Sequence, residues 1–549
     1  MNALERLTEA DAVKRLAERD TSLFSDDIDV RIAIGQRLGW TDLAAKAPER
    51  FTLLGNLALA IAGEGATDVL LLGMGGSSLA PLVFSRMLGP VAGAPTLHVL
   101  DTTSPRQIRA TLDALDPAKT FVIVASKSGG TIEPLSLYAI ARRWLEGSMS
   151  RPEAGRRCIV ITDPGSSLEK LRQRDLMRVA LTAPASVGGR YSALTVFGLA
   201  PAALAGIELA PIIERARRME EACALLAPAS PAALLAAWIV DAHAARRDKL
   251  TLVTSASFAP FGLWVEQLVA ESLGKHGIGV VPVIEYEPTL PSGYSGDRAV
   301  VVIREASDAA LAEWAAAVAA EHPVLELTVD GALDVAAEFV RWEWATALAG
   351  FLLGVNPFDE PNVTQAKQAT SDILSGRTEV PHAAADLEGS WMTFAGSLAA
   401  PEPLPSSRPG VLGALTRSLA PGDYLAILAY LPEDERLLGP LRHAATAVSR
   451  ATGRAVMLEL GPRYLHSTGQ LHKGGTPNGA FLLITARDRD DFEVPGKPYR
   501  LAALHRAQAE GDLVTLAAAG SRALRVDLPS SDLEVVDALA QDLIASTRA

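Results

Sequence analysis

The sequence predicts an α/β protein built on doubly wound parallel sheets, and two observations support this fold class. Apolar runs of five to seven residues alternate with helical stretches from about residue 51 onward, and the alternation starts again near residue 250. Such alternation is typical of βαβ units with right-handed crossovers. A third, similar region begins near residue 424, after a Pro-rich stretch that marks a linker at 400–409. We therefore expect an N-terminal helical segment, two parallel-sheet domains and a C-terminal α/β region, at 1–50, 51–225, 226–400 and 401–549.

Composition narrows the class of protein further. The chain has 549 residues, of which 49% are hydrophobic and 21% charged, as in a well-packed globular protein. A net charge of −13 without basic tracts argues against nucleic acid or an anionic membrane as a partner. The two cysteines, Cys158 and Cys223, lie in apolar patterns and are predicted to be buried thiols, which fits a reducing cytoplasm. No signal-peptide pattern or bilayer-length apolar run is present, so we expect a soluble, cytoplasmic protein.

The first elements follow from simple periodicity. Leu4, Leu7, Ala12 and Leu16 recur at near-helical spacing among charges, which predicts amphipathic helices in the first 50 residues. Five buried strands are then predicted in the first array, at DVLLLG, TLHVLD, TFVIVA, RCIVITD and MRVALTA.

A glycine-rich turn follows the first predicted strand. The run LLLGMGGSS places Gly76 and Ser77 between that strand and a helix that opens near Pro81. Free N–H groups at a helix start bind anions, most often phosphate. The glycine spacing does not match the dinucleotide pattern, and no P-loop Lys follows. A tight strand–helix turn without a ligand is the alternative reading.

A second turn of the same kind follows the strand TFVIVA. It contains Ser126, Lys127, Ser128 and Thr131, separated by two glycines. Two hydroxyl-rich turns at the carboxyl ends of parallel strands indicate one shared anion pocket. The alternative is two ordinary helix caps, although a cap needs one hydroxyl rather than several.

Two later stretches add charged candidates. The turn SVGGRYS either aims Arg190 into the cleft or leaves it on the surface. The second array begins at LTLVTSAS, with further strands at 300–303 and 324–329, and a helix is predicted over Pro260–Lys275. Gln267 and Glu271 share one face of that helix. Glu271 lies in its last turn, where the helix dipole is expected to raise the pKa of the carboxyl toward that of a usable base; a solvated Glu is the alternative.

The stretch FLLGVNPFDEPNVTQAK predicts another helix. Asp359 is a candidate N-cap, Pro361 lies near the helix start, and Lys367 lies about two turns in. In the third region, strands are predicted near 424–430, 455–460 and 480–485. Between the last two lies a predicted loop that holds His466, His472 and Lys473. Histidines in a Gly/Ser/Thr loop indicate chemistry, but their spacing and lack of Cys or carboxylate neighbours fit zinc poorly.

Taken together, these stretches resemble the glucose-6-phosphate isomerase family. The pieces that carry the resemblance occur in order from about residue 70 to 475: GMGGSSLAP, ASKSGGTIEP, GGRYS, QLVAES and FLLGVNPFDEPNVTQAK. The chain is most similar to the isomerase half of transaldolase–isomerase fusions. The resemblance implies two sugar-isomerase (SIS) domains and reversible interconversion of glucose 6-phosphate and fructose 6-phosphate in glycolysis and gluconeogenesis. It implies no metal or other cofactor, and a homodimer.

The resemblance also implies roles for individual residues. Glu271 matches the base that moves a proton between C1 and C2, Arg190 the arginine that stabilises the enediolate, and Lys367 the lysine that assists ring opening. Gln267 lines the sugar site. The matching phosphate-binding residues are Gly76 and Ser77 in the first turn and Ser126, Ser128, Thr131 and the Lys127 backbone in the second.

The chain departs from the family pattern at two positions. The family's ring-opening histidine lies between the base and the lysine, where this chain has only His276 and His322, in unmatched contexts. The loop around His466 resembles the missing segment, so His466 is predicted to open the ring from the third region, which could complete the site of a monomer. Glu360 stands where most members have Gln. We expect it to be protonated, turned away, or paired with Lys367 or Lys473.

Two other functions stay open at this stage. One is a bifunctional phosphoglucose/phosphomannose isomerase, because a small change around Gln267 or the Ser128–Thr131 turn could set whether mannose 6-phosphate is accepted. A non-catalytic sugar-phosphate-sensing SIS protein would keep the phosphate serines and lose the base, and the presence of Glu271, Arg190 and Lys367 together argues against it.

Overall fold

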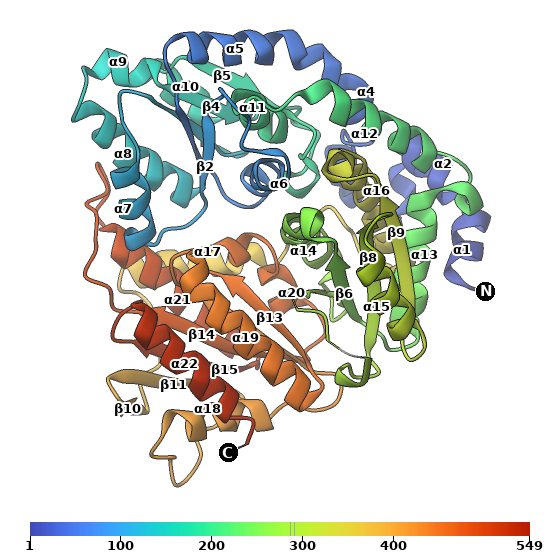
Figure 1. The fold of residues 1–549 in the computed structure, drawn as a ribbon, viewed down its shortest axis with the longest axis vertical. Helices are drawn as coiled ribbons and strands as arrows, with labels where there is room; N and C mark the ends of the chain where they lie inside the picture. The colour runs from blue at the N-terminus through green and yellow to red at the C-terminus, as the bar shows by residue number, and fades with distance from the viewer. Residues whose placement is uncertain (286, 290, 549) are drawn as a thin grey trace.

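The protein consists of three sheets with helices packed around them (Figure 1). The structure, a computed structural model, describes residues 1–285, 287–289 and 291–548. The first sheet and its helices lie at the upper left of Figure 1, the second sheet at the right, and the C-terminal sheet below. This arrangement confirms the predicted α/β class.

The first sheet is parallel throughout, in the order β2-β1-β3-β4-β5. All five strands were expected from the apolar runs: β1 Asp68–Leu72, β2 Thr96–Leu100, β3 Thr120–Ala125, β4 Cys158–Thr162 and β5 Val179–Thr182. Alternate side chains point to opposite faces, so Leu70 and Leu72 pack in one core cluster while Val69 and Leu71 pack in another. Because both faces are covered, the central strands are apolar without interruption.

Helices cover both faces of this sheet. The face that includes Val69 packs against α5 Phe51–Gly63, α6 Leu79–Leu88 and α11 Val196–Leu204. The face that includes Leu70 packs against α7 Pro105–Ala114, α8 Ile132–Glu146, α9 Arg151–Arg156 and α10 Ser167–Arg174. The helices predicted for the N-terminal segment are α1 Ala3–Glu9, α2 Ala12–Ala17, α3 Ile28–Gly35 and α4 Leu43–Lys46.

The second sheet has the order β7-β6-β8-β9 and is also parallel. Its strands are β6 Lys249–Thr254, β7 Val281–Ile284, β8 Arg298–Glu305 and β9 Val324–Val329. The sequence did not predict β7, which is only four residues long and contains Pro282, so it is tolerated at the edge of the sheet. The accompanying helices are α12 Leu209–Cys223, α13 Pro231–Ala244, α14 Gly262–Leu273, α15 Ala309–Ala319 and α16 Val335–Leu353.

The C-terminal sheet is mixed, in the order β10-β11-β15-β14-β12-β13. The three predicted strands are β12 Tyr424–Ala429, β13 Ala455–Leu460 and β14 Gly479–Ala486. Three further strands were not predicted: β10 Ala385–Leu387, β11 Ser390–Gly396 and β15 Arg522–Leu528. One face packs against α18 Arg408–Arg417, α19 Glu435–Thr452 and α22 Leu533–Ala545, and α21 Leu501–Ala518 covers the other.

The three sheets meet around helix α14. Ala270 of α14 and Val283 of β7 share one apolar cluster with Tyr424 and Phe481 of the C-terminal sheet, and Leu471 of α20 Gly469–Gly474 joins them. Helix α17 Val363–Leu374 packs along α21. The helices that carry Gln267, Glu271 and Lys367 are therefore held against the C-terminal sheet.

The cysteines and the apolar helices agree with the expectations from sequence. Cys158 and Cys223 are both free and buried, as predicted. No helix in the described part of the chain is long and apolar enough to span a bilayer.

Candidate functional site

The first glycine turn packs against the turn that carries Arg190. Gly76 lies in a 3₁₀ turn, Gly75–Ser77, and Arg190 in another, Gly189–Tyr191. A Cβ atom at Gly76 would lie 2.1 Å from the Gly189 carbonyl oxygen, so no side chain fits there. The Ser192 hydroxyl also donates to the Gly76 carbonyl oxygen over 3.1 Å. The close approach explains the glycine and brings Ser77 and Arg190 into neighbouring turns.

The second turn leaves its helix start uncapped. Thr131 occupies the N-cap position of α8, but its side chain makes no capping hydrogen bond; its hydroxyl lies 2.9 Å from the Ser126 hydroxyl. The Lys127 side chain forms an ion pair with Asp163, so only the backbone of Lys127 is left to bind a ligand at this turn. Ser78, which precedes α6, makes no capping hydrogen bond either. The alternative of two ordinary helix caps is therefore not observed.

A cavity of about 670 Å³ opens beside the second turn. It joins residues from the first sheet, from α17 and from the C-terminal part of the chain. Its walls include Ser128, Gly130, Thr131, Ile132, Glu133, Ala366, Lys367, Thr370, Ser371, Leu374, Leu465, His466, Tyr499 and Gln508. Four residues predicted from sequence, Ser128, Thr131, Lys367 and His466, are thus brought together although they span more than 300 positions.

His466 is held by a buried carboxylate from the first sheet's helix layer. Its Nε2 lies 2.9 Å from Glu133 Oε1, which also accepts a hydrogen bond from Gln508 Nε2 over 2.7 Å. Burial acts to raise the pKa of Glu133, but His466 and Lys367 outweigh it and leave this pKa below its usual value. An ionised Glu133 accepts a hydrogen bond from Nε2–H, which fixes the tautomer and leaves Nδ1 for a ligand.

Arg190 and Glu271 form a buried ion pair at the end of α14. Arg190 Nη1 lies 3.1 Å from Glu271 Oε1, and the two side chains are 4% and 12% exposed. The other oxygen, Oε2, is buried and has no hydrogen-bond partner among the described residues. Burying an ionised carboxylate oxygen without a hydrogen-bond partner costs free energy, which favours the uptake of a proton by this atom.

The pKa of Glu271 is raised, as predicted, but mainly for another reason. Burial is the largest cause; Glu360 adds to it, while Arg190, Lys275 and His466 oppose it. The helix dipole, which motivated the prediction, is not among these causes. The sequence placed Glu271 correctly in the last turn of α14, yet its burial depends on the packing of the other sheets.

Gln267 connects the Arg190–Glu271 pair with the cavity. It lies on α14 one turn before Glu271, and its Nε2 donates to the His466 carbonyl oxygen over 2.6 Å. A Cβ atom at Gly75 would lie 2.8 Å from Gln267 Nε2 and 2.9 Å from the His466 carbonyl oxygen. The first glycine turn, Gln267 and His466 therefore lie side by side.

The region before Lys367 differs from the prediction. Asp359 does not cap α17; Asn362 holds the N-cap position without a side-chain hydrogen bond, and Asp359 accepts from Lys275 Nζ over 2.7 Å. Lys367 is exposed in the second turn of α17 and lines the cavity.

Glu360 is bound to neither predicted lysine. Its Oε2 lies 3.2 Å from Arg190 Nη1. Lys473 instead pairs with the buried Asp512 at 2.5 Å.

The two histidines of the predicted loop have different environments. The stretch contains helix α20 rather than a continuous loop, and His472 is buried between Tyr424 and Glu459, with its ring nitrogens 3.0 and 2.9 Å from them. Only His466 reaches the cavity. The described residues hold no group of three or more His, Cys, Asp or Glu with metal-ligand geometry.

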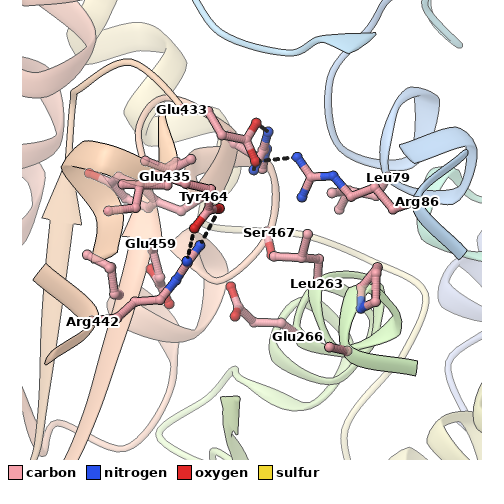
Figure 2. A pocket seen from close by; sticks show the side chains of 16 residues that line it. Leu79, Arg86, Leu263, Glu266, Glu433, Glu435, Arg442, Glu459, Tyr464 and Ser467 are labelled. Carbon is pink, nitrogen blue, oxygen red and sulfur yellow. Dashed lines mark hydrogen bonds and ion pairs between the residues drawn. The ribbon is translucent and has the colours of Figure 1, made fainter. Parts of the chain in front are cut away.

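A second, smaller cavity is lined in part by other residues of the turn that carries His466 (Figure 2). Arg463, Tyr464 and Ser467 line it, whereas Leu465 and His466 face the larger cavity. Glu266, also on α14, points into this smaller cavity. Arg463 makes two 2.7 Å hydrogen bonds to Asp101, at the end of β2, and one of 2.6 Å to Glu433. The turn that carries His466 is thus anchored to the first sheet.

Sequence reasoning missed Glu133, Gln508 and Arg463. Glu133 lies within the ASKSGGTIEP stretch, so its position in that motif was a usable signal. Gln508 and Arg463 act across separations of 375 and 362 residues, and no local pattern marks them.

The fold and the site define an α/β protein with an uncapped, hydroxyl-rich helix start and a buried carboxylate–arginine pair. Comparison with known proteins agrees: the family model described as "Phosphoglucose isomerase" matches residues 6–281. The chain belongs to the phosphoglucose isomerase family.

Individual relatives match a larger part of the chain. The glucose-6-phosphate isomerase of Thermus thermophilus is 30% identical over 388 residues, which cover 62% of this chain and 91% of the relative. That of Rubrobacter xylanophilus is 29% identical over 359 residues, which cover 56% and 83%. Among solved structures, a hypothetical protein of T. thermophilus is 26% identical with a TM-score of 0.57, covering 68% of this chain and 97% of the other. A glucose-6-phosphate isomerase of Chlamydia trachomatis shares the fold at 17% identity, with a TM-score of 0.53 and coverage of 69% and 85%.

Proposed function

We propose that the protein interconverts glucose 6-phosphate and fructose 6-phosphate through an enediolate. The observation that carries the proposal is the state of Glu271: one oxygen is paired with Arg190, while the other is buried and has no partner among the described residues. A carboxylate with a raised pKa beside a fixed cation is what proton abstraction next to a carbonyl requires.

The phosphate is assigned to the two glycine turns. Ser126, Ser128, Thr131 and the Lys127 backbone surround the start of α8, and Gly76 and Ser77 contribute from the neighbouring turn. The partial positive charge and open N–H groups of a helix start stabilise a dianion there. This local site is needed because the net charge of −13 repels an anionic substrate overall.

Glu271 is assigned the isomerisation step. Its Oε2 takes the proton from C2 of the open-chain aldose, and the electron pair forms an enediolate with the negative charge on the C1 oxygen. The proton of the C2 hydroxyl passes to the C1 oxygen, the proton held by Glu271 returns at C1, and the C2 carbonyl of the ketose forms. Arg190 stabilises the negative oxygen as it develops. Gln267, which is fixed by the His466 carbonyl, orients the sugar. No step changes the oxidation state of the substrate overall.

His466 and Lys367 are assigned ring opening. Because Glu133 holds Nε2, the Nδ1 atom of His466 can exchange a proton with a ring or hydroxyl oxygen of the cyclic sugar. His466 contacts Glu133 and Gln267 of its own chain, so one subunit carries the whole proposed set. A homodimer is compatible with this but is not needed to complete the site, and we expect the enzyme to work in the cytoplasm.

The decisive experiment is a coupled assay with fructose 6-phosphate, in which an NADP-dependent dehydrogenase reports glucose 6-phosphate. We expect strong activity in the wild type and a loss of about 10²- to 10⁴-fold or more in Glu271→Gln, because the base is removed at nearly constant volume. Glu266→Gln is the matched control: this carboxylate lies on the same helix but faces the smaller cavity. Its activity should stay near that of the wild type.

Other outcomes favour other functions. If the wild type binds the sugar phosphate without turnover, the sensing function replaces this proposal. If Glu271→Gln is nearly as active as the wild type, the reaction stands and the base has been misplaced. The same assay with mannose 6-phosphate decides whether the enzyme is bifunctional.

A further inference from the structure

One charged residue of the site has no role in the mechanism described so far. Glu360 lies between α16 and α17, and its carboxylate reaches the same nitrogen that holds the base. Arg190 Nη1 is 3.2 Å from Glu360 Oε2 and 3.1 Å from Glu271 Oε1. Two carboxylates thus lie within ion-pair distance of one guanidinium nitrogen.

The rest of the Arg190 guanidinium is already committed. Its Nε donates to Ser272 Oγ over 2.8 Å, and its Nη2 donates to the carbonyl oxygens of Pro357 and Asp359, each over 2.8 Å. The side chain is 4% exposed. Because a guanidinium is planar and rigid, Arg190 cannot turn to give Glu271 a two-point ion pair.

The charges around Glu271 show what Glu360 contributes. The groups that favour its ionised form are Arg190, Lys275 and His466, and the group that opposes them is Glu360. Lys275 is fully buried and held by Asp359 and the Asn356 carbonyl, so it is fixed in place. Without Glu360, Arg190, Lys275 and His466 would be left as the main charged or protonatable groups that act on the base.

We propose that Glu360 is a positioning residue that shares Arg190 with Glu271 and so prevents the base from being tied up in a one-to-one ion pair. This inference rests on the proposed isomerase function. When Glu271 takes up the substrate proton, it loses its charge, and Arg190 is left with Glu360 and the new enediolate oxygen. The negative charge of Glu360 therefore favours the transfer of the proton to Glu271, while Arg190 remains available for the intermediate.

The test is the pH dependence of kcat/KM for fructose 6-phosphate in the wild type and Glu360→Gln. Without the Glu360 charge, Glu271 is the one carboxylate of the two that still pairs with Arg190. Its pKa should fall, because a nearby cation favours the ionised carboxylate. The acidic limb of the profile should move to lower pH. The weaker base should also reduce kcat at neutral pH by roughly 3- to 30-fold, less than the loss of a general base altogether.

Two further variants separate electrostatics from loop structure. Arg37 Nη1 lies 3.9 Å from Glu360 Oε1, the oxygen that does not pair with Arg190, so Arg37→Gln frees the Glu360 charge and should move the acidic limb slightly the other way, to higher pH. Glu360→Asp keeps the charge and should stay nearer to the wild type than Glu360→Gln. A purely structural role predicts no such opposite shifts.

The inference is overturned if the acidic limb of Glu360→Gln coincides with that of the wild type. Should Glu360→Gln be too slow to assay, carboxyl ¹³C NMR titration, with Glu271→Gln identifying the signal, gives the same answer: an unchanged Glu271 titration overturns it. Failure of the proposed function is a different result, because the wild type itself would then be inactive.

Discussion

His466 is the residue whose proposed role is tested most sharply by substitution. Its ring lines the cavity and is oriented by Glu133, while Glu271 belongs to the neighbouring cluster. His466→Ala should therefore slow turnover of the cyclic sugar on the order of 10²-fold while slowing an open-chain analogue much less. Stopped-flow comparison of the two substrates measures the difference.

Tyr499→Phe provides the control for this variant. Tyr499 lines the same cavity, but its hydroxyl lies 3.1 Å from Ser136. Both substrates should react as in the wild type. Equal losses on the cyclic and the open-chain substrate in His466→Ala would remove His466 as the ring-opening group.

At the scale of single residues, the sequence predicted which residues line the cavity better than it predicted their contacts. The motifs indicated Ser128, Thr131, Lys367 and His466, and the structure places all four on one cavity. They did not indicate that Glu360 would bind Arg190. Such contacts follow from how distant segments pack, which no local pattern encodes.

The contact between the two glycine turns can be tested at the scale of elements. Gly76→Ala would place a Cβ atom 2.1 Å from the Gly189 carbonyl oxygen, so the turns must move apart. We expect a loss of about 1–3 kcal/mol in the free energy of unfolding, as is usual for overpacking, together with a loss of activity. Urea unfolding and the coupled assay measure the two effects.

Gly189→Ala is the matched change on the other turn. A Cβ atom there meets nothing within 4 Å, so the free energy of unfolding should stay close to the wild-type value. If Gly76→Ala is as stable and as active as the wild type, the turns are not held in the way that the structure shows.

Among the elements, the sequence predicted those whose apolar pattern is uninterrupted. All five strands of the first sheet were found in this way, since both faces of that sheet are buried. Strand β15 was missed because its buried charges hide the run: Arg525 lies 3.2 Å from Glu510, and Asp527 accepts from Thr485 over 2.7 Å. Helix α20 was missed because its six residues include two glycines.

At the scale of the whole molecule, the proposed site depends on segments outside the part matched by the family model. That match ends at residue 281, whereas Lys367 and His466 lie beyond it. His466 follows a strand of the C-terminal sheet, and two hydrogen bonds from Arg463 to Asp101 hold the turn that carries His466 against the first sheet. Segments of the first and the C-terminal sheet regions therefore both contribute to the proposed site.

A site made within one chain predicts an enzyme that does not need a partner subunit for catalysis. The His466 ring contacts Glu133 of its own chain, and its carbonyl binds Gln267 of its own chain. We expect mixtures of Glu271→Gln and His466→Ala to stay as inactive as the separate variants, even after unfolding and refolding together. Analytical ultracentrifugation at assay concentrations gives the oligomeric state of each sample.

Activity recovered in the mixture would show that histidine and base come from different subunits, which would contradict the within-chain arrangement. Specific activity of the wild type across a dilution series is the second readout. A fully active monomer excludes a site shared between subunits. An activity that falls as a dimer dissociates would mean that the partner subunit supports the site, even though the proposed histidine and base lie in the same chain.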